Sequence, residues 1–292
     1  MREPSSLPWS VPLPAAARPE RPERRALPRD AASIWRALCS PWAWAPPAVG
    51  LALLAALVAA DADRAVFLAL NHGGAILGTP FWLGLTLLGD GAVALALVLP
   101  CIRRAPRCFW AALVAGLVAA AWAQGWKYAI EIPRPLTVLA PDAFVHAGPA
   151  YRHASFPSGH AAAAFALGGV WAMTLRSRLL RLPVLALAAL VALSRVMVGV
   201  HWPVDLLGGM LGGWLGAWLG LALAGSRGWH TRGRGALAAG GVLLALCVAL
   251  LVVRHGGTGA ALALQRLIGT LCLAVGAREL AALRMGRARH VR

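Results

Sequence analysis

Eight runs of mostly uncharged, apolar residues divide this chain, and they constrain its fold more than any other feature. Several approach the roughly 20 residues that an α-helix needs to cross the hydrocarbon core of a bilayer. Lipid offers no partners to unpaired backbone groups, so such runs are expected to be helical. The sequence predicts an all-α, polytopic transmembrane bundle with helices at residues 44–60, 81–102, 109–127, 161–176, 182–200, 203–224, 236–253 and 259–277.

Composition supports a membrane protein and argues against a nucleic-acid-binding one. Hydrophobic residues make up 59% of the chain and charged residues only 13%, which is far from the usual makeup of soluble domains. The formal net charge is +17, but the basic residues lie in short loops and at the two ends. They do not form one patch interleaved with aromatic residues, as a nucleic-acid surface would require.

The distribution of arginine predicts the orientation of the bundle. Residues 1–40, a Pro- and Arg-rich arm expected to be disordered, contain seven arginines, and the even-numbered connections and residues 278–292 are also arginine-rich. By the positive-inside rule both ends are cytoplasmic, and a bacterial inner membrane is the expected location.

The eighth run has Gln265 and Arg266 near its middle. It either crosses the membrane or lies at its surface; the arginine-rich tail favours a crossing.

Three polar motifs fall in the connections after the third and fifth predicted helices, which share the outer face. The first two, in the earlier connection, read KYAIEIPRP (residues 127–135) and FPSGH (156–160). The third, in the later connection, reads SRVMVGVHWPVD (194–205). They bring cations, two histidines, a serine and an aspartate to one side of the membrane.

The second motif has the features of an anion-binding helix start. Ser158 is suited to cap the helix, and the free N–H groups of its first turn favour an anion. Gly159 lets a phosphate oxygen approach the backbone, and His160 lies beside it. Nothing in this motif alone distinguishes such a site from an ordinary capped helix.

The third motif pairs a histidine with a carboxylate. His201 and Asp205 are four residues apart and share one face if the segment is helical. A carboxylate on one imidazole nitrogen fixes the tautomer and leaves the other nitrogen free to attack. Arg195 can bind phosphate oxygens through two N–H groups. Lys127, which is the only lysine of the chain, and Arg134, held between two prolines, add positive charge.

Lys-x6-Arg-Pro, Pro-Ser-Gly-His and Ser-Arg-x5-His-x3-Asp, in this order, resemble the type 2 phosphatidic acid phosphatase (PAP2) superfamily, which includes the vanadium haloperoxidases. The resemblance covers about residues 44–224 and points to the membrane-bound lipid phosphatase branch. It implies a six-helix core (41–224), to which this chain adds a helix pair (225–277) and a basic tail (278–292). It also implies that no metal or other cofactor is needed.

The resemblance also implies a role for each matching residue. His201 would attack phosphorus and form a phosphohistidine, Asp205 would orient it, and His160 would protonate the leaving oxygen and later activate water. The phosphoryl oxygens would be held by Lys127, Arg134, Ser158, Gly159 and Arg195. Trp202 stands where many relatives have tyrosine, which would change the wall of the pocket.

The expected function is hydrolysis of a lipid phosphomonoester or diphosphate at the extracytoplasmic face. Phosphatidic acid, phosphatidylglycerol phosphate, an undecaprenyl diphosphate carrier and the phosphate of lipid A are all candidate substrates. Two alternatives stay open: a phosphotransferase that uses an acceptor other than water, and a transporter or scaffold without catalytic activity.

Three further features also carry expectations. Asp90 lies inside the second apolar run, where a carboxylate has either a functional, accessory role or a hydrogen-bonded packing role. The glycines of LLGGMLGGWLGAWLG (residues 206–220) indicate close helix packing. Trp122, Trp126 and Trp202 are expected to anchor the outer membrane interface.

Overall fold

A computed structural model describes residues 35–148, 150–226, 233–254 and 259–288, and within them every regular element is helical. Most of the predicted N-terminal arm therefore lies outside the described residues. A helical turn at residues 35–38 precedes the long helices, which are α2 (Pro41–Ala59), α7 (Pro106–Ala129), α9 (Gly159–Thr174), α10 (Arg178–Met197), α11 (Pro203–Ser226), α12 (Arg234–Val252) and α13 (Ala260–Ala288). The short helices are α3 (Asp63–Gly73), the 3-10 turn η1 (Gly74–Ile76), α4 (Thr79–Leu87), α5 (Gly91–Val98), α6 (Cys101–Arg104) and α8 (Pro135–Val138).

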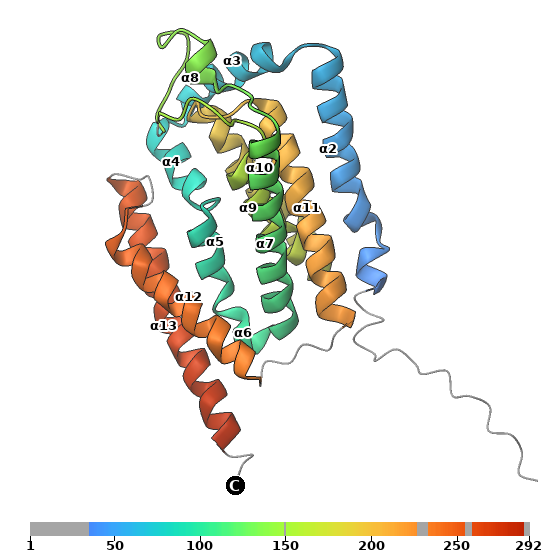
Figure 1. Cartoon of the computed structure of the whole chain (residues 1–292), viewed down its shortest axis with the longest axis vertical. Coiled ribbons are helices and arrows are strands. Elements are labelled where there is room, and N and C mark those ends of the chain that lie inside the picture. The colour runs from blue at the N-terminus through green and yellow to red at the C-terminus, as the bar shows by residue number, and fades with distance from the viewer. Residues whose placement is uncertain (1–34, 149, 227–232, 255–258, 289–292) are drawn as a thin grey trace, which may run out of the picture.

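The helices form one bundle whose successive crossings run in opposite directions, with α4, α5 and α6 together forming the crossing between α2 and α7 (Figure 1). Six described helices are long and apolar enough to cross a membrane: α2, α7, α10, α11, α12 and α13. The shorter, largely buried α9 and the segmented run α4–α6 also traverse the bundle, which confirms the predicted polytopic α-helical fold. Both ends of the described chain lie at one end of the bundle, and α3 and α8 lie at the other (Figure 1).

The second apolar run, predicted as a single helix over 81–102, is broken. α4 ends at Leu87 and α5 begins at Gly91. Asp90 is the N-cap of α5, where its Oδ1 accepts from the backbone N–H groups of Ala92 (2.9 Å) and Val93 (3.1 Å). The carboxylate thus satisfies N–H groups that the break leaves without helical partners. The apolar composition of the run indicated a membrane segment, but it did not reveal the interruption.

Glycines on α11 bring this helix into close contact with α7 and α9. A Cβ at Gly213 would lie 2.2 Å from the carbonyl oxygen of Ala162 on α9, and one at Gly216 would lie 2.6 Å from that of Ala115 on α7. Both distances are far below van der Waals contact, so only glycine allows these backbones to approach so closely. The prediction of close packing along the glycine run is confirmed.

The C-terminal helices α12 and α13 pack on each other and on α4, α5 and α6. Gln265 and Arg266 are not in the middle of α13 as expected, because the helix continues to Ala288. They lie in its second turn, where the Gln265 side-chain amide donates to the carbonyls of Leu250 and Val253, both at 2.7 Å. The amide thereby satisfies carbonyls at the end of α12.

A buried carboxylate fixes the opposite end of α13 to the core. Glu279 is fully buried and accepts from the side chains of Arg103 (2.5 Å) and Arg104 (3.1 Å) on α6. A buried charge of this kind is tolerated only when it is paired. The two contacts therefore hold the C-terminal helix pair, through α13, against α6, the last helix of the segmented run α4–α6.

Candidate active site

Two connections that are distant in sequence meet at the end of the bundle opposite the chain ends. The backbone N–H of Ser158 donates to the carbonyl of Asp205 (2.9 Å), and the N–H of Ser155 donates to that of Ile132 (2.9 Å). Ser158 is the N-cap of α9, and its Oγ accepts from the N–H of Ala161 (3.3 Å). The FPSGH loop is thereby fixed against both the α7–α8 connection and the first turn of α11.

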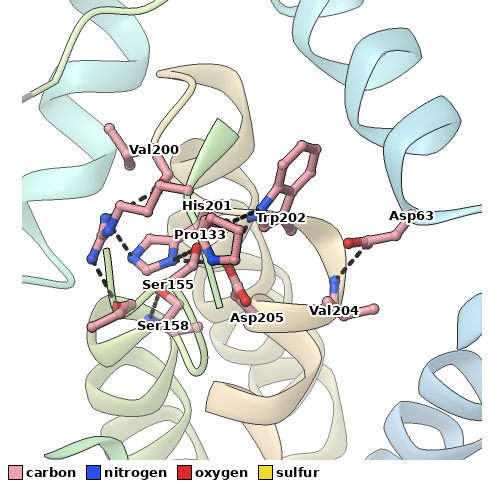
Figure 2. A network of polar contacts seen from close by, with 12 residues as sticks. Asp63, Pro133, Ser155, Ser158, Val200, His201, Trp202, Val204 and Asp205 are labelled. Carbon is pink, nitrogen blue, oxygen red and sulfur yellow. Dashed lines mark hydrogen bonds and ion pairs between the residues drawn. The ribbon is translucent and has the colours of Figure 1, made fainter. Parts of the chain in front are cut away.

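His201 and Asp205 form the centre of this region (Figure 2). His201 Nδ1 lies 3.0 Å from Asp205 Oδ2, and both side chains are buried. Because a carboxylate accepts hydrogen bonds, this contact places the ring proton on Nδ1 and leaves the lone pair of Nε2 free. The spacing of the two residues in sequence predicted their pairing, and the geometry agrees with it.

Ser155 is part of the same network, although the sequence analysis did not identify it. Its Oγ lies 2.5 Å from Asp205 Oδ2 and 3.5 Å from His201 Nδ1. The backbone N–H of Trp202 donates to the same carboxylate oxygen at 2.8 Å. These donors fix the orientation of Asp205, and through it that of the imidazole ring. Only the position of Ser155, three residues before Ser158, could have drawn attention to it.

Arg134 joins the two connections and faces the imidazole. Its guanidinium donates to the carbonyls of His153 (3.0 Å), Val200 (3.0 Å) and Ala154 (3.4 Å). Its Nη1 also lies 3.4 Å from Nε2 of His201. The side chain is therefore held in one position by three carbonyls, with its positive charge next to the free imidazole nitrogen.

Arg195 presents an unsatisfied donor. Its Nη1 donates to Thr86 Oγ1 on α4 (2.5 Å), whereas its buried Nε has no hydrogen-bond partner among the described residues. A buried donor without a partner costs about 1–3 kcal/mol, and an oxygen of a bound anion would remove that cost. Thr86, which positions this arginine, lies 109 residues earlier in the chain and was not identified from the sequence.

Lys127, Gly159 and His160 line a cavity of about 310 Å³ between α5, α7 and α9. The rest of the lining is mostly alanine, glycine and leucine, so the cavity is polar near His160 and apolar further along the helices. At Gly159, a Cβ would have its nearest neighbour 4.0 Å away, which leaves the backbone there accessible. His160 and His201 lie within electrostatic range of each other.

The electrostatics of the site keep His201 neutral. Burial, together with the positive charges of Arg134, Arg195 and Lys127, lowers the pKa of His201 well below its usual value. Three of the predicted cations therefore act on one imidazole, although they come from α7, α10 and the segment before α8. The arrangement combines a neutral nucleophilic nitrogen with a strongly positive surrounding.

The structure bears on two further expectations. The hydrogen bonds of Asp90 at the N-cap of α5 agree with a packing role, one of the two roles that the sequence left open. Trp202 does not anchor a membrane interface: it is 7% exposed, packs against Phe67 with ring centroids 5.0 Å apart, and donates from Nε1 to the carbonyl of Pro133 (2.8 Å). It lies in the wall of the site because α3, which carries Phe67, covers this end of α11.

One family model and two solved structures are similar to parts of this chain. The family model described as the PAP2 superfamily matches residues 108–229, a range that contains all three sequence motifs. Two solved structures show similarity: LpxE from Aquifex aeolicus (TM-score 0.49, 23% identity, 55% of this chain and 94% of that one) and a transmembrane PAP2 type phosphatidylglycerolphosphate phosphatase from Bacillus subtilis (TM-score 0.41, 25% identity, 60% and 94%). No curated protein matches the chain.

Proposed function

We propose that this protein is an integral membrane phosphatase that hydrolyses a lipid phosphomonoester or diphosphate, and the match of residues 108–229 to the PAP2 superfamily model supports this proposal. The reaction proceeds through a phosphohistidine and requires no metal. The pairing of His201 Nδ1 with Asp205, which leaves Nε2 beside Arg134, is the observation on which the proposal depends. A structural histidine would not need a free nitrogen next to a fixed guanidinium.

In the first step, Nε2 of His201 attacks phosphorus and the bond from phosphorus to the leaving oxygen breaks. The lone pair of Nε2 forms the new bond, and Asp205 stabilises the positive charge that develops on the ring. The leaving oxygen takes a proton from His160, acting as its imidazolium. Burial and the positive charges of Arg195 and Lys127 disfavour this form in the empty site. The negative charge of the bound phosphate offsets these cations, so His160 is protonated when the substrate binds. This histidine is suitably placed, at the start of α9 and on the lining of the same cavity as Lys127.

In the second step, water attacks the phosphohistidine. His160, now neutral, removes a proton from the water, and the bond from phosphorus to Nε2 breaks. Inorganic phosphate is released, and both histidines return to their starting states. One residue thus serves as acid and then as base, as microscopic reversibility allows.

The cations hold the phosphoryl oxygens and stabilise their charge in the transition state. Arg195 offers its unsatisfied Nε, and Arg134 lies next to the attacking nitrogen. Lys127 and the accessible backbone at Gly159 complete the set, and Ser158 holds the start of α9 in place.

The cavity supports a lipid substrate. Its apolar part runs along α5, α7 and α9 toward the middle of the bundle, and Ala120 and Gln124 on its lining are exposed on α7. In a membrane this side of the bundle faces lipid, so a hydrocarbon chain can enter sideways with its phosphate beside Lys127 and His160. The charge distribution supports an extracytoplasmic location for this end of the bundle.

The proposal is tested with purified protein in detergent and a panel of lipid phosphates, including phosphatidic acid and undecaprenyl diphosphate. We expect release of inorganic phosphate that persists in chelator and is blocked by vanadate. His201→Ala is expected to lose at least about 10³-fold in kcat, whereas His153→Ala, a change at an exposed histidine of the same loop, is expected to retain activity. Unchanged turnover in His201→Ala would support a scaffold or transporter instead.

A covalent intermediate is tested with His160→Ala and an aryl phosphate, whose leaving group needs no proton. The variant is expected to accumulate a phosphoprotein that is labile in acid, because step one proceeds while step two lacks its base. The wild-type products also separate hydrolase from transferase: free phosphate indicates water as the acceptor, and a phosphorylated alcohol indicates transfer.

A further inference from the structure

A second cavity, at the end of the bundle opposite the candidate active site, has the chemistry of an anion site. It has a volume of about 480 Å³ and lies where the turn at residues 35–38 meets the start of α7 and the α9–α10 connection. Four arginines line it: Arg36, Arg107, Arg176 and Arg181. No carboxylate is found among the described residues of its lining.

These arginines come from three separate parts of the chain, the turn at residues 35–38, the start of α7 and the α9–α10 connection with the first turn of α10, and they converge on one space. Arg107 lies in the first turn of α7, where the helix dipole also favours an anion. Arg181 is held in place, because its Nε and Nη2 both donate to the carbonyl of Leu175 (3.0 and 2.7 Å) and its guanidinium lies over the ring of Trp42. A fixed guanidinium loses less entropy on binding an anion.

The cavity also has apolar residues in its lining. Met173, Leu175 and Leu221 contribute to it, at the ends of α9 and α11. A cavity lined by both arginines and apolar side chains, at the level where membrane helices end, matches a lipid headgroup and the first carbons below it. A small soluble anion would make no use of the apolar side chains.

We propose that this cavity binds the phosphate group of an anionic membrane lipid in the leaflet opposite the candidate active site. Guanidinium groups bind phosphate oxygens through pairs of N–H groups, and several can share one headgroup. The positive-inside rule explains why arginines lie at this end of the bundle, but it requires no cavity and no convergence of four of them.

The two sites are separate. α9 runs from His160 to Thr174, which lines the second cavity, and 14 residues of α-helix correspond to about 21 Å. The bound lipid would therefore be a permanent neighbour of the fold and not a substrate. It would connect the start of α2 and α7 with the α9–α10 connection.

The test uses phosphatidylglycerol, a phosphodiester that the proposed monoester and diphosphate chemistry does not consume. Its binding to purified full-length protein is titrated by native mass spectrometry, with zwitterionic phosphatidylcholine as the reference lipid. The test variant is Arg107→Gln/Arg176→Gln. The control, Arg234→Gln/Arg284→Gln, removes the same charge from exposed arginines at the same end of the bundle, away from the cavity.

We expect the Kd for phosphatidylglycerol to rise about tenfold or more in the test variant, to change little in the control, and to remain weak for phosphatidylcholine throughout. Equal weakening in both double variants would show general surface attraction and overturn the proposal. Displacement of the lipid by millimolar inorganic phosphate would overturn the lipid assignment in favour of a soluble anion. Circular dichroism melts in phosphatidylcholine check that both double variants remain folded. If the test variant does not fold, the single variant Arg176→Gln, in the exposed connection, replaces it.

Discussion

At the scale of single residues, the candidate site depends on how hydrogen bonds are divided around His201. Asp205 Oδ2 accepts from the ring, from Ser155 Oγ and from the backbone N–H of Trp202. All three donors act on one oxygen, so the carboxylate is fixed and cannot rotate away from Nδ1. Among the described residues, the opposite nitrogen has Arg134 as its hydrogen-bond partner, at the long distance of 3.4 Å, and a substrate oxygen can readily displace this contact.

The lowered pKa of His201 leads to a prediction about the pH dependence of kcat/KM, which reports ionisations of the free enzyme. His201 acts as its neutral form, and its pKa lies well below the usual value because of burial and nearby cations. Removing the positive charge in Arg134→Gln raises that pKa, so the acid limb moves to higher pH. We expect a shift of about one pH unit, or about 1.4 kcal/mol.

Arg134→Lys is the matched control for this profile. It keeps the charge and loses the guanidinium contacts with the carbonyls, so its activity falls while its acid limb stays near that of the wild type. Ionisation of the substrate is the same in all three enzymes and cancels in the comparison. Equal shifts of the acid limb in Arg134→Gln and Arg134→Lys would show that the position of this limb depends on the geometry of residue 134 and not on its charge.

At the scale of elements, the break between α4 and α5 shows what the sequence could and could not predict. The motifs predicted the pairing of His201 with Asp205 and the capped start of α9, because these depend on residues a few positions apart. They did not predict that Thr86 would bind Arg195 or that Gly89 would pack on His160. Such contacts join segments many residues apart, and only the packed bundle determines them.

The break is also the basis of a prediction about Gly89. A Cβ at this residue would lie 2.8 Å from Val191 Cγ1 and 3.0 Å from both Cβ and the carbonyl oxygen of His160. Gly89→Ala should therefore displace the first turn of α9, and a misplacement of about 1 Å can cost about 10²-fold in rate. We expect kcat to fall by roughly that factor and Tm to fall as well.

Gly91→Ala is a sensitive control, because it lies two residues away and lines the same cavity, yet a Cβ there would meet nothing within 4 Å. Its kcat and Tm should remain close to those of the wild type. Comparable losses in the two variants would mean that the segment tolerates no side chain for reasons unrelated to His160.

At the scale of the whole molecule, the bundle places the candidate active site and the chain ends at opposite ends (Figure 1). Counting arginines in the connections predicted the same separation, since the arginine-rich connections lead away from the motifs. The sequence could not predict how α12 and α13 attach. The attachment depends on Glu279 meeting Arg103 and Arg104, and those arginines had suggested only an orientation.

The orientation itself can be measured with the cysteines of the chain. Cys39 is exposed and lies at the end of the bundle that carries the chain ends, and Asp142 is exposed in the connection beside the candidate active site. If that site is extracytoplasmic, a membrane-impermeant maleimide should label Asp142→Cys, made in a Cys39→Ala background, in intact cells. The wild-type protein should be labelled at Cys39 only after the membrane is permeabilised. Each protein thus reports one face, and the opposite pattern of labelling would place the phosphate chemistry on the cytoplasmic side.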